Sequence, residues 1–421
     1  MKFLHTSDWH LGKLFHEKSL IEDQEYVLNQ IIDIAKKAEE KGEPYAALVV
    51  SGDIYDRALP PADATQLLNR FLVKVAAELP ELHIFMNSGN HDSATRLAFA
   101  SEFLAFHNIH IATDIKNMCT PVIVERNGEK AAFYQLPFLT PQPVKSEEPG
   151  EILKSQEELY GAVCSLILES HRKNYGDMPS VINAHLFTSG SETGSSERAN
   201  VGTLEQVSVS HFKDFTYGAF GHIHRFQACD KEKHCYYPGS LLPYNFDDSP
   251  ECGILEVEID CSMNCSGAGG KNTTTDMKSE LEKPPVVNRI LLKPLHKISK
   301  VKAQMKDLIG SGANKALISE NADNYVQVIL TDEVMPTEAF SNLKTVFPFL
   351  LSVTSEARTG GLSGFSTELR RQAILSNEPE KIFDQFMSDL YGVDFTCSAG
   401  IQAPFEKQRS LFLEEAVKTS E

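Results

Sequence analysis

Features that would place the chain outside the cytoplasm or in a membrane are missing from the sequence. It has eight cysteines in 421 residues and none forms a C-x-x-C pair, so neither a disulfide-stapled secreted domain nor a structural zinc site is expected. It has no run of about eighteen apolar residues, the length needed to span a bilayer. The first ten residues, MKFLHTSDWH, lack the apolar core of a signal peptide. We therefore expect a cytoplasmic protein with no membrane partner.

Positive charge is also scarce. Lysine and arginine total 40 residues against 58 aspartates and glutamates, which gives a formal net charge of −18. Such a field repels nucleic acid, so any phosphate-binding surface must be local or must rely on bound cations. The balance argues against a protein that coats DNA, but it is compatible with an enzyme whose acidic side chains hold metal ions.

Short apolar runs alternate with amphipathic segments over the first 260 residues, a pattern typical of a mixed α/β fold. Five bounded runs suit buried strands: Lys2–Ser7, Ala46–Ser51, Leu82–Asn87, Ser180–Ala184 and Thr216–Phe220. Helical periods between the first runs predict three helices: Glu22–Lys41, a segment from Pro61 to Leu79, and a segment after Ser93. Pro121–Leu136, with Asn127–Gly128 at its centre, predicts a β-hairpin. We expect sheets whose edges are extended by antiparallel strands.

The composition changes after a first domain expected over residues 1–260. Residues 261–285 are rich in glycine, serine, threonine and lysine and predict either a flexible linker or a long hairpin loop that joins Gly253–Ile259 to Val286–Leu292. A small α+β domain is then predicted over 286–360. Its expected elements are the strand Asn288–Leu292, the helix Ser299–Ile309, the strand Tyr325–Leu330, the helix Thr337–Phe347 and the strand Leu351–Ser355.

Only helical patterns remain from residue 366 to residue 418, notably Glu380–Tyr391 and Pro404–Lys418. One side of the first of these carries apolar residues, namely Ile382, Phe383, Phe386, Met387, Leu390 and Tyr391. Such a stripe suits binding of the helix in the groove of a partner protein, or packing within its own domain.

Each of the five predicted strands ends in residues that can ligate a metal ion. The clusters are Asp8-Trp9-His10, Gly52-Asp53-Ile54-Tyr55-Asp56, Gly89-Asn90-His91-Asp92, His185 and Gly221-His222-Ile223-His224. Ligand sites of open α/β sheets lie beyond the carboxyl ends of the strands, so these clusters should converge on one rim. A single such histidine is usually structural, but five clusters on successive strands are hard to reach by chance.

The donor types indicate the metal. Carboxylate, amide oxygen and imidazole without thiolate suit manganese, iron or a catalytic zinc. The predicted metal ligands are Asp8, His10, Asp53, Asn90, His185, His222 and His224. Seven ligands are too many for one ion that must keep positions open for substrate, so we predict two divalent ions that share a bridging carboxylate. Such pairs clamp the attacking and leaving oxygens of an in-line displacement, which indicates phosphoester hydrolysis.

The motifs also carry a family resemblance. Asp8-x-His10, Gly52-Asp53-x-x-Asp56, Gly89-Asn90-His91-Asp92, His185 and Gly221-His222-x-His224 resemble the motifs of the calcineurin-like metallophosphoesterase superfamily. Within it, HTSDWHLGK, VVSGDIYDR, NSGNHDS and YGAFGHIHR are most similar to a branch of DNA nucleases. The resemblance implies a two-sheet β-sandwich flanked by helices, followed by a small α+β capping domain and C-terminal helices.

The resemblance further implies a role for each site residue. One manganese ion would be held by Asp8, His10, Asp53 and His224. The other would be held by Asp53, Asn90, His185 and His222, with Asp53 as the bridge. His91 would contact the scissile phosphate and either stabilise its charge or protonate the leaving oxygen, and Asp56 would orient His91.

The resemblance also implies the substrate and the partners. Such nucleases work as homodimers with two copies of a coiled-coil ATPase, which the C-terminal helices bind. They degrade double-stranded DNA ends 3′ to 5′ with ATP and cut single strands and hairpins, in repair, recombination and replication. Residues 286–306 hold six lysines or arginines and no acid, and are either a DNA contact or a solvated face. The candidate contacts are Arg289, Lys293, Lys297 and Lys300.

Two other functions compete with this hypothesis. A sister enzyme of the same superfamily would hydrolyse phosphoproteins or small phosphoesters with the same metal site, although the region after residue 286 exceeds what a compact phosphatase needs. A non-catalytic scaffold would retain the fold but lack a ligand, and none of the seven is missing.

Overall fold

The computed structural model describes residues 1–140, 155–192, 206–230, 234–261, 283–333 and 336–356. The chain divides into two compact units, the first made of residues 1–299 with 323–325 and the second of residues 300–322 and those from 326 onward. Both predicted helices after residue 366, and nearly all of the 261–285 segment, lie outside the described residues. No helix in the described ranges is long and apolar enough to cross a membrane.

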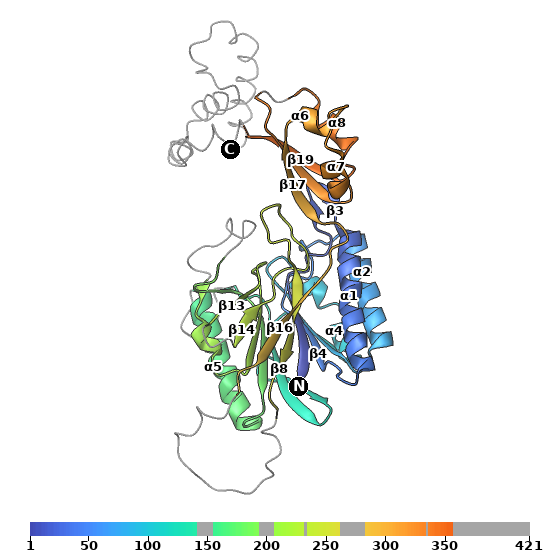
Figure 1. The fold of residues 1–421 in the computed structure, drawn as a ribbon. Coiled ribbons are helices and arrows are strands. Elements are labelled where there is room, and N and C mark those ends of the chain that lie inside the picture. Colours follow the sequence, from blue (N-terminus) through green and yellow to red (C-terminus); the bar gives the residue numbers. More distant parts are fainter. Residues whose placement is uncertain (141–154, 193–205, 231–233, 262–282, 334–335, 357–421) are drawn as a thin grey trace, which may run out of the picture. The chain divides into compact units, whose positions relative to one another are not determined.

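Two six-stranded sheets form the first unit (Figure 1). The first sheet has the order β16 (Val286–Leu291), β15 (Gly253–Glu258), β1 (Lys2–Thr6), β4 (Ala47–Val50), β5 (His83–Asn87) and β6 (Ile109–Ala112). The second has the order β13 (Gln227–Ala228), β14 (Cys235–Tyr237), β12 (Tyr217–Gly221), β9 (Ser180–His185), β8 (Glu129–Leu136) and β7 (Val122–Arg126). The inner strands of each sheet are parallel, and β15, β16, β13 and β7 add antiparallel edges as expected.

Aromatic residues fill the space between the two sheets. The ring of Phe133 on β8 stacks on Phe85 of β5 with centroids 4.7 Å apart, and its edge meets Phe3 of β1 at 5.5 Å. Tyr217 of β12 packs against the same Phe3 at 5.5 Å. All four side chains are almost completely buried, so burial of these large apolar surfaces holds the sandwich together.

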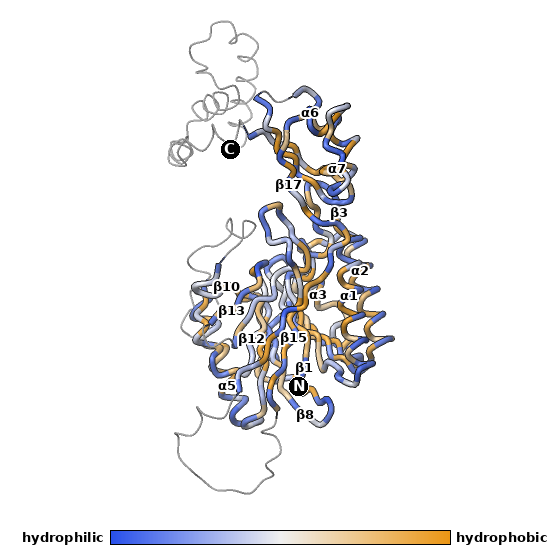
Figure 2. The backbone as a smooth tube through the Cα atoms, viewed as in Figure 1, coloured by the Kyte–Doolittle hydropathy of each residue, from blue (hydrophilic) through white to orange (hydrophobic). Residues whose placement is uncertain are grey.

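Helices cover the outer faces of the sandwich. The helices α1 (Ile21–Glu40) and α2 (Ala62–Glu78) lie side by side over the first sheet, and α5 (Gln156–Asn174) packs on the second (Figure 1). Each buries one apolar stripe, such as Val27 and Ile31 on α1 and Leu67 and Phe71 on α2. Figure 2 shows the stripe as an alternation of orange and blue along α1 and α2. The predicted two-sheet sandwich flanked by helices is therefore confirmed.

The smaller elements of the first unit lie in its connections. They are the strands β2 (Leu14–Phe15), β3 (Lys18–Ser19), β10 (Phe187–Thr188) and β11 (Gln206–Val207), the helices α3 (Ala94–Leu97) and α4 (Ser101–Ala105), and the 3₁₀ helix η2 (Val209–Phe212). The single helix predicted after Ser93 is wrong, because Ala100 adopts a left-handed conformation with φ 59° that separates α3 from α4.

The second unit is a small α+β body. Its strands are β17 (Ile298–Ala303), β18 (Tyr325–Leu330) and β19 (Leu350–Ser355), and its helices are α6 (Met305–Leu308), α7 (Lys315–Asn321) and α8 (Ala339–Lys344). The core of this unit includes Val301, Val328, Leu343 and Phe347. The helix predicted over 299–309 is wrong in its first half, because β-branched Val301 is buried by strand pairing.

The division between the units also differs from the predicted boundary at residue 286. The strand β16 pairs with β15 in antiparallel register over its whole length, from Gly253↔Leu291 to Glu258↔Val286, and therefore completes the first sheet. The two strands on either side of the 261–285 segment are thus neighbours in the first sheet. The hairpin predicted around Asn127–Gly128 is present as β7 and β8.

Candidate metal centre

The five predicted clusters follow five parallel strands of the two sheets. The strands β1, β4 and β5 of the first sheet lead into the segments that carry Asp8 and His10, Asp53, and Asn90. The strand β9 ends in His185, and β12 leads directly into His222 and His224. The carboxyl ends of these strands meet at one rim, where each sheet supplies part of the site.

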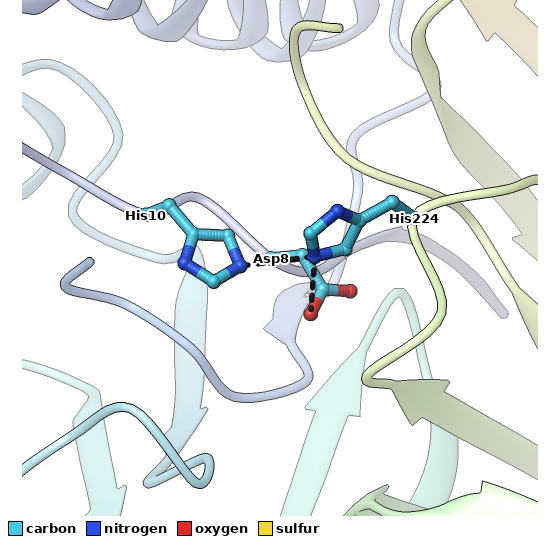
Figure 3. A group of neighbouring side chains, drawn as sticks. All are labelled: Asp8, His10 and His224. Carbon is cyan, nitrogen blue, oxygen red and sulfur yellow. Dashed lines mark hydrogen bonds and ion pairs between the residues drawn. The ribbon is translucent and has the colours of Figure 1, made fainter. Parts of the chain in front are cut away.

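The first group of neighbouring side chains consists of Asp8, His10 and His224 (Figure 3). The Nε2 atom of His10 lies 3.0 Å from Nε2 of His224, which in turn lies 4.0 Å from a carboxylate oxygen of Asp8. Asp8 and His10 are completely buried. Two imidazole nitrogens and a carboxylate oxygen thus face one point, as metal ligands do.

The second group surrounds His185. Its Nε2 atom lies 3.5 Å from Oδ2 of Asp53 and 3.0 Å from Oδ1 of Asn90, and the same Asn90 oxygen is 3.1 Å from Nδ1 of His222. The Asp53 Oδ2 atom also lies 3.6 Å from Nε2 of His10. Asp53 therefore stands between the two groups, and the structure brings all seven predicted ligands together.

Backbone conformations at the site are unusual. Asp8, His10, Asp53 and His222 all have positive φ, at 51°, 44°, 48° and 107° respectively. Residues other than glycine seldom adopt this region, and when they do they cluster at functional sites because the surrounding structure holds them there. Positive φ at four of the seven candidate ligands is therefore a local feature of this site.

Two glycines allow the strands to approach closely behind the ligands. A Cβ atom on Gly89 would lie 2.0 Å from Oδ1 of Asp53, and one on Gly221 would lie 1.7 Å from the carbonyl oxygen of Ser51. No side chain fits at either place. The glycines of these motifs are therefore needed for packing of the centre rather than as ligands.

Hydrogen bonds fix the orientation of several ligands. The Nδ1 atom of His185 is 2.8 Å from the carbonyl oxygen of Ser51, so Nδ1–H donates there and Nε2 is left to face Asp53. The backbone N–H of His222 donates to Asp8 at 3.1 Å, and that of His91 donates to Asp53 at 2.9 Å. Main-chain donors thus hold both carboxylates in place.

Burial and neighbouring charges set the ionisation of the ligands. Burial lowers the pKa of His224 to about 3 and of His222 to about 4, which keeps both imidazoles neutral. Burial also raises the pKa of Asp8 to about 7. Burial opposes the charge of Asp53 too, but the charge of His185 holds the pKa of that carboxyl well below its usual range.

The donor set fits a divalent cation. If Nδ1 of His185 donates to Ser51, a neutral His185 directs its Nε2 lone pair at the oxygens of Asp53 and Asn90, which is repulsive unless a proton or a metal ion lies between them. Without a metal ion, a proton on Nε2 of His185 would take this place. Burial disfavours protonation, yet the carboxylate of Asp53 raises the pKa of His185 to about 9. A cation at this point would replace that proton.

His91 and Asp56 lie beside the first group and contact each other. The Nδ1 atom of His91 is 2.9 Å from the backbone carbonyl oxygen of Asp56, whereas the Asp56 carboxylate binds Nζ of Lys13 at 2.8 Å. Asp56 therefore contacts His91 through its main chain. Asp92 accepts hydrogen bonds from the backbone N–H groups of Ile54, Tyr55 and Gly89 and ties two of the ligand loops together.

Sequence reasoning missed three residues that support the site. The first is Gln24 on α1, which donates to the carbonyl oxygen of His10 at 2.8 Å and accepts a hydrogen bond from the N–H of Gly12. The second is Tyr244, whose hydroxyl donates to the carbonyl oxygen of Trp9 at 2.6 Å. Lys13 is the third. Gln24 could have been found, because it is a polar residue on the buried stripe of α1 that continues with Val27, Leu28 and Ile31.

The four candidate DNA contacts lie away from the ligand motifs in sequence and differ in exposure. The guanidinium of Arg289 on β16 donates a hydrogen bond to the carbonyl oxygen of Glu251 at 2.6 Å and lies above the ring of Phe226. Lys293, Lys297 and Lys300 are exposed.

Two comparisons place this site among known proteins. Residues 1–226, which include every predicted ligand, match the family described as calcineurin-like phosphoesterase. The SbcD component of the nuclease SbcCD from Staphylococcus epidermidis is 28% identical over 398 residues, which cover 93% of this chain and 96% of that protein. Together with the clustered carboxylates and imidazoles, the family match indicates a phosphoester hydrolase that uses divalent metal. The chain belongs to the calcineurin-like phosphoesterase family.

Proposed function

We propose that this chain is the nuclease component of an SbcCD-like complex and hydrolyses DNA phosphodiesters with two Mn²⁺ ions. The observation that carries the proposal is the grouping of the seven candidate ligands around two points on either side of Asp53, whose Oδ2 atom lies 3.5 Å from Nε2 of His185 and 3.6 Å from Nε2 of His10. The similarity to a component of a nuclease along 93% of the chain supports a nucleic acid substrate over a small phosphoester.

The two groups of side chains correspond to two ion positions. The first ion would be held by Asp8, His10, Asp53 and His224, and the second by Asp53, Asn90, His185 and His222. When bound, such a pair lowers the pKa of a water molecule and neutralises charge on the phosphate. Asp53 is suited to the shared position because its carboxylate faces a histidine of each group.

His91 is the proposed catalytic residue of the chain. Its Nδ1 atom is engaged by the carbonyl oxygen of Asp56, which leaves Nε2 as the atom available to substrate. Its ring meets that of His10 edge to face with centroids 4.8 Å apart, so it stands beside the ligands rather than among them. With Nδ1–H donating to that carbonyl oxygen, Nε2 is a donor only when both ring nitrogens are protonated, and in that form His91 would stabilise the scissile phosphate or give a proton to the leaving 3′ oxygen.

Partners follow from the same proposal. An SbcC-like ATPase would bind the segment after residue 366, where the sequence predicts helices, and would supply ATP-driven 3′ to 5′ degradation of double-stranded ends, in addition to cleavage of single strands and hairpins. Exposed Lys293, Lys297 and Lys300 would help to hold DNA on an otherwise acidic chain.

We further propose that two copies pair within the complex. The side chains of Phe99, Phe103 and Phe106, on and beside α4, are 83%, 64% and 86% exposed and form an apolar surface suited to a second copy. The variant Phe103→Glu should shift the sedimentation of the protein from dimer toward monomer, and an unchanged dimer would remove this surface from the proposal.

Cleavage of a labelled DNA hairpin with its ATPase partner tests the function. Wild type should cut with Mn²⁺, His91→Leu should lose about two to four orders of magnitude in rate, and both should bind Mn²⁺ alike. Exposed His107 provides the matched control, since His107→Leu should cut as wild type does. Hydrolysis of small phosphomonoesters without any DNA cleavage would refute the nuclease and favour a phosphatase.

A further inference from the structure

We propose that the Asp56 carboxylate is a positioning residue for the metal ligand His10 and is itself held by Lys13. The inference rests on the metal centre proposed above. It differs from the role that the family resemblance implies, in which Asp56 orients His91. The structure separates the two roles because the main chain and the side chain of Asp56 contact different partners.

The starting observation is an unpaired nitrogen. The Nδ1 atom of His10 is buried and has no hydrogen-bond partner among the described residues. Buried polar atoms without partners are rare in folded proteins, and each needs a reason. In this case the other nitrogen of the ring, Nε2, points at His224 and Asp53, where the first cation is proposed.

A cation at that position decides where the proton of His10 lies. A ligating imidazole is neutral and offers a lone pair, so when Nε2 faces the ion the proton must be on Nδ1. That N–H would then be a buried donor, and leaving it unpaired costs about 1–3 kcal/mol. The ligand therefore requires an acceptor on its far side.

Asp56 provides the acceptor. Its Oδ1 atom lies 3.6 Å from Nδ1 of His10, just beyond hydrogen-bond range, and a small rotation of either side chain closes the gap. The rings of His91 and Tyr244 border His10 on other sides, but neither forms a hydrogen bond with its Nδ1 atom. His91 already donates through Nδ1 to the Asp56 carbonyl oxygen, and the Tyr244 hydroxyl donates to Trp9.

Lys13 keeps the carboxylate in this place. Its Nζ atom is 2.8 Å from the same Oδ1 atom of Asp56 and lies 5.4 Å from the centroid of the Tyr244 ring. The Asp56 side chain is only 16% exposed, so water competes weakly for it. The group formed by His10, Asp56 and His91 could resemble a third metal site, but the ammonium of Lys13 already neutralises its carboxylate.

Carboxylates that accept from the far nitrogen of a ligating histidine orient the ring and raise its basicity, and their loss weakens metal binding about 10–100-fold. We therefore expect Asp56→Leu to weaken one of the two Mn²⁺ sites by that factor and to leave the other unchanged. Asp56→Asn retains an acceptor oxygen and should lose less affinity. Lys13→Met should lie between Asp56→Asn and wild type, because the carboxylate remains but is less well held.

Calorimetric titration of the full chain with Mn²⁺ measures both sites without reference to cleavage. Exposed Asp63 supplies the control, since Asp63→Leu removes one charge outside the site and should bind as wild type does. Thermal unfolding in EDTA checks that each variant folds. If Asp56→Leu does not fold, the two single variants Asp56→Asn and Lys13→Met carry the test.

The outcomes are distinct. Two unchanged Mn²⁺ affinities in folded Asp56→Leu, with slower DNA cleavage, would overturn the inference and return Asp56 to a role at His91. Equal weakening of both sites would also overturn it, because the structure connects Asp56 with His10 alone among the ligands. Failure of wild type to bind two ions would instead refute the proposed metal centre.

Discussion

Replacement of Gly221 by alanine tests how closely the two sheets must approach at the metal centre. Gly221 ends β12 and pairs with His185 of β9. An added methyl group would lie 1.7 Å from the carbonyl oxygen of Ser51 and 2.9 Å from Nδ1 of His185. Both are well inside van der Waals contact, and the first is a contact with main chain, which cannot rotate away.

The expected loss has two parts. Forcing extra volume into a packed interior costs about 1–3 kcal/mol. Displacement of the Ser51 carbonyl oxygen also breaks its 2.8 Å bond with His185, and an unpaired buried group costs about 1–3 kcal/mol more. The sum of about 2–6 kcal/mol is a large share of the roughly 5–15 kcal/mol that stabilises a typical domain.

Urea unfolding in EDTA measures this loss separately from metal binding, and titration with Mn²⁺ should then show a weakened site at His185. The matched control is Gly312→Ala, at an exposed position whose nearest heavy atom would lie 3.6 Å from the new Cβ. It should change stability by no more than about 0.5 kcal/mol. A Gly221→Ala protein as stable as this control would refute the reasoning.

Three further outcomes are expected. Burial lowers the pKa of His5 from 6.5 to about 3, so between these pH values the unfolded chain binds a proton that the folded chain does not. The free energy of unfolding therefore falls as the pH drops from 6.5 toward 3. The variant His5→Gln should flatten this slope in urea titrations. Mn²⁺ at 100 times its Kd should stabilise wild type by about 2.7 kcal/mol and Asp53→Asn far less, as read by thermal unfolding. Tyr244→Phe removes the hydrogen bond to Trp9 and should reduce stability by about 1 kcal/mol in urea.

The proximity of the candidate ligands could be predicted from sequence because chemistry and topology reinforce each other. Asp8, Asp53 and His185 lie far apart in the chain, but each follows a short apolar run, and parallel strands bring their ends to one edge. The strand Tyr325–Leu330 was predicted to the residue for a related reason, since four of its six residues, YVQVIL, are β-branched or aromatic and suit a buried strand.

What could not be predicted depends on contacts rather than on pattern. The lysines of Ile298–Ala303 allow either a helix or a strand, and only burial of Val301 against neighbouring strands decides between them. The break at Ala100 has no glycine or proline to signal it. The role of Asp56 depends on which of its oxygens faces His91 and which faces Lys13, and that is a matter of rotamer and not of motif.

The metal centre also acts as a connection between the two sheets. The Ser51 carbonyl oxygen follows β4 of the first sheet and holds His185 of the second, while the N–H of His222 follows β12 of the second and holds Asp8 of the first. Neither sheet alone contains a complete set of ligands for either proposed ion. Separation of the sheets at this rim would therefore dismantle both proposed ion positions, and an ion bound there would oppose the separation. Stability without metal and metal affinity should accordingly fall together in variants that alter sheet packing at the rim, such as Gly221→Ala. In variants that leave the packing intact, such as Asp56→Leu, metal affinity should fall without a matching loss of stability.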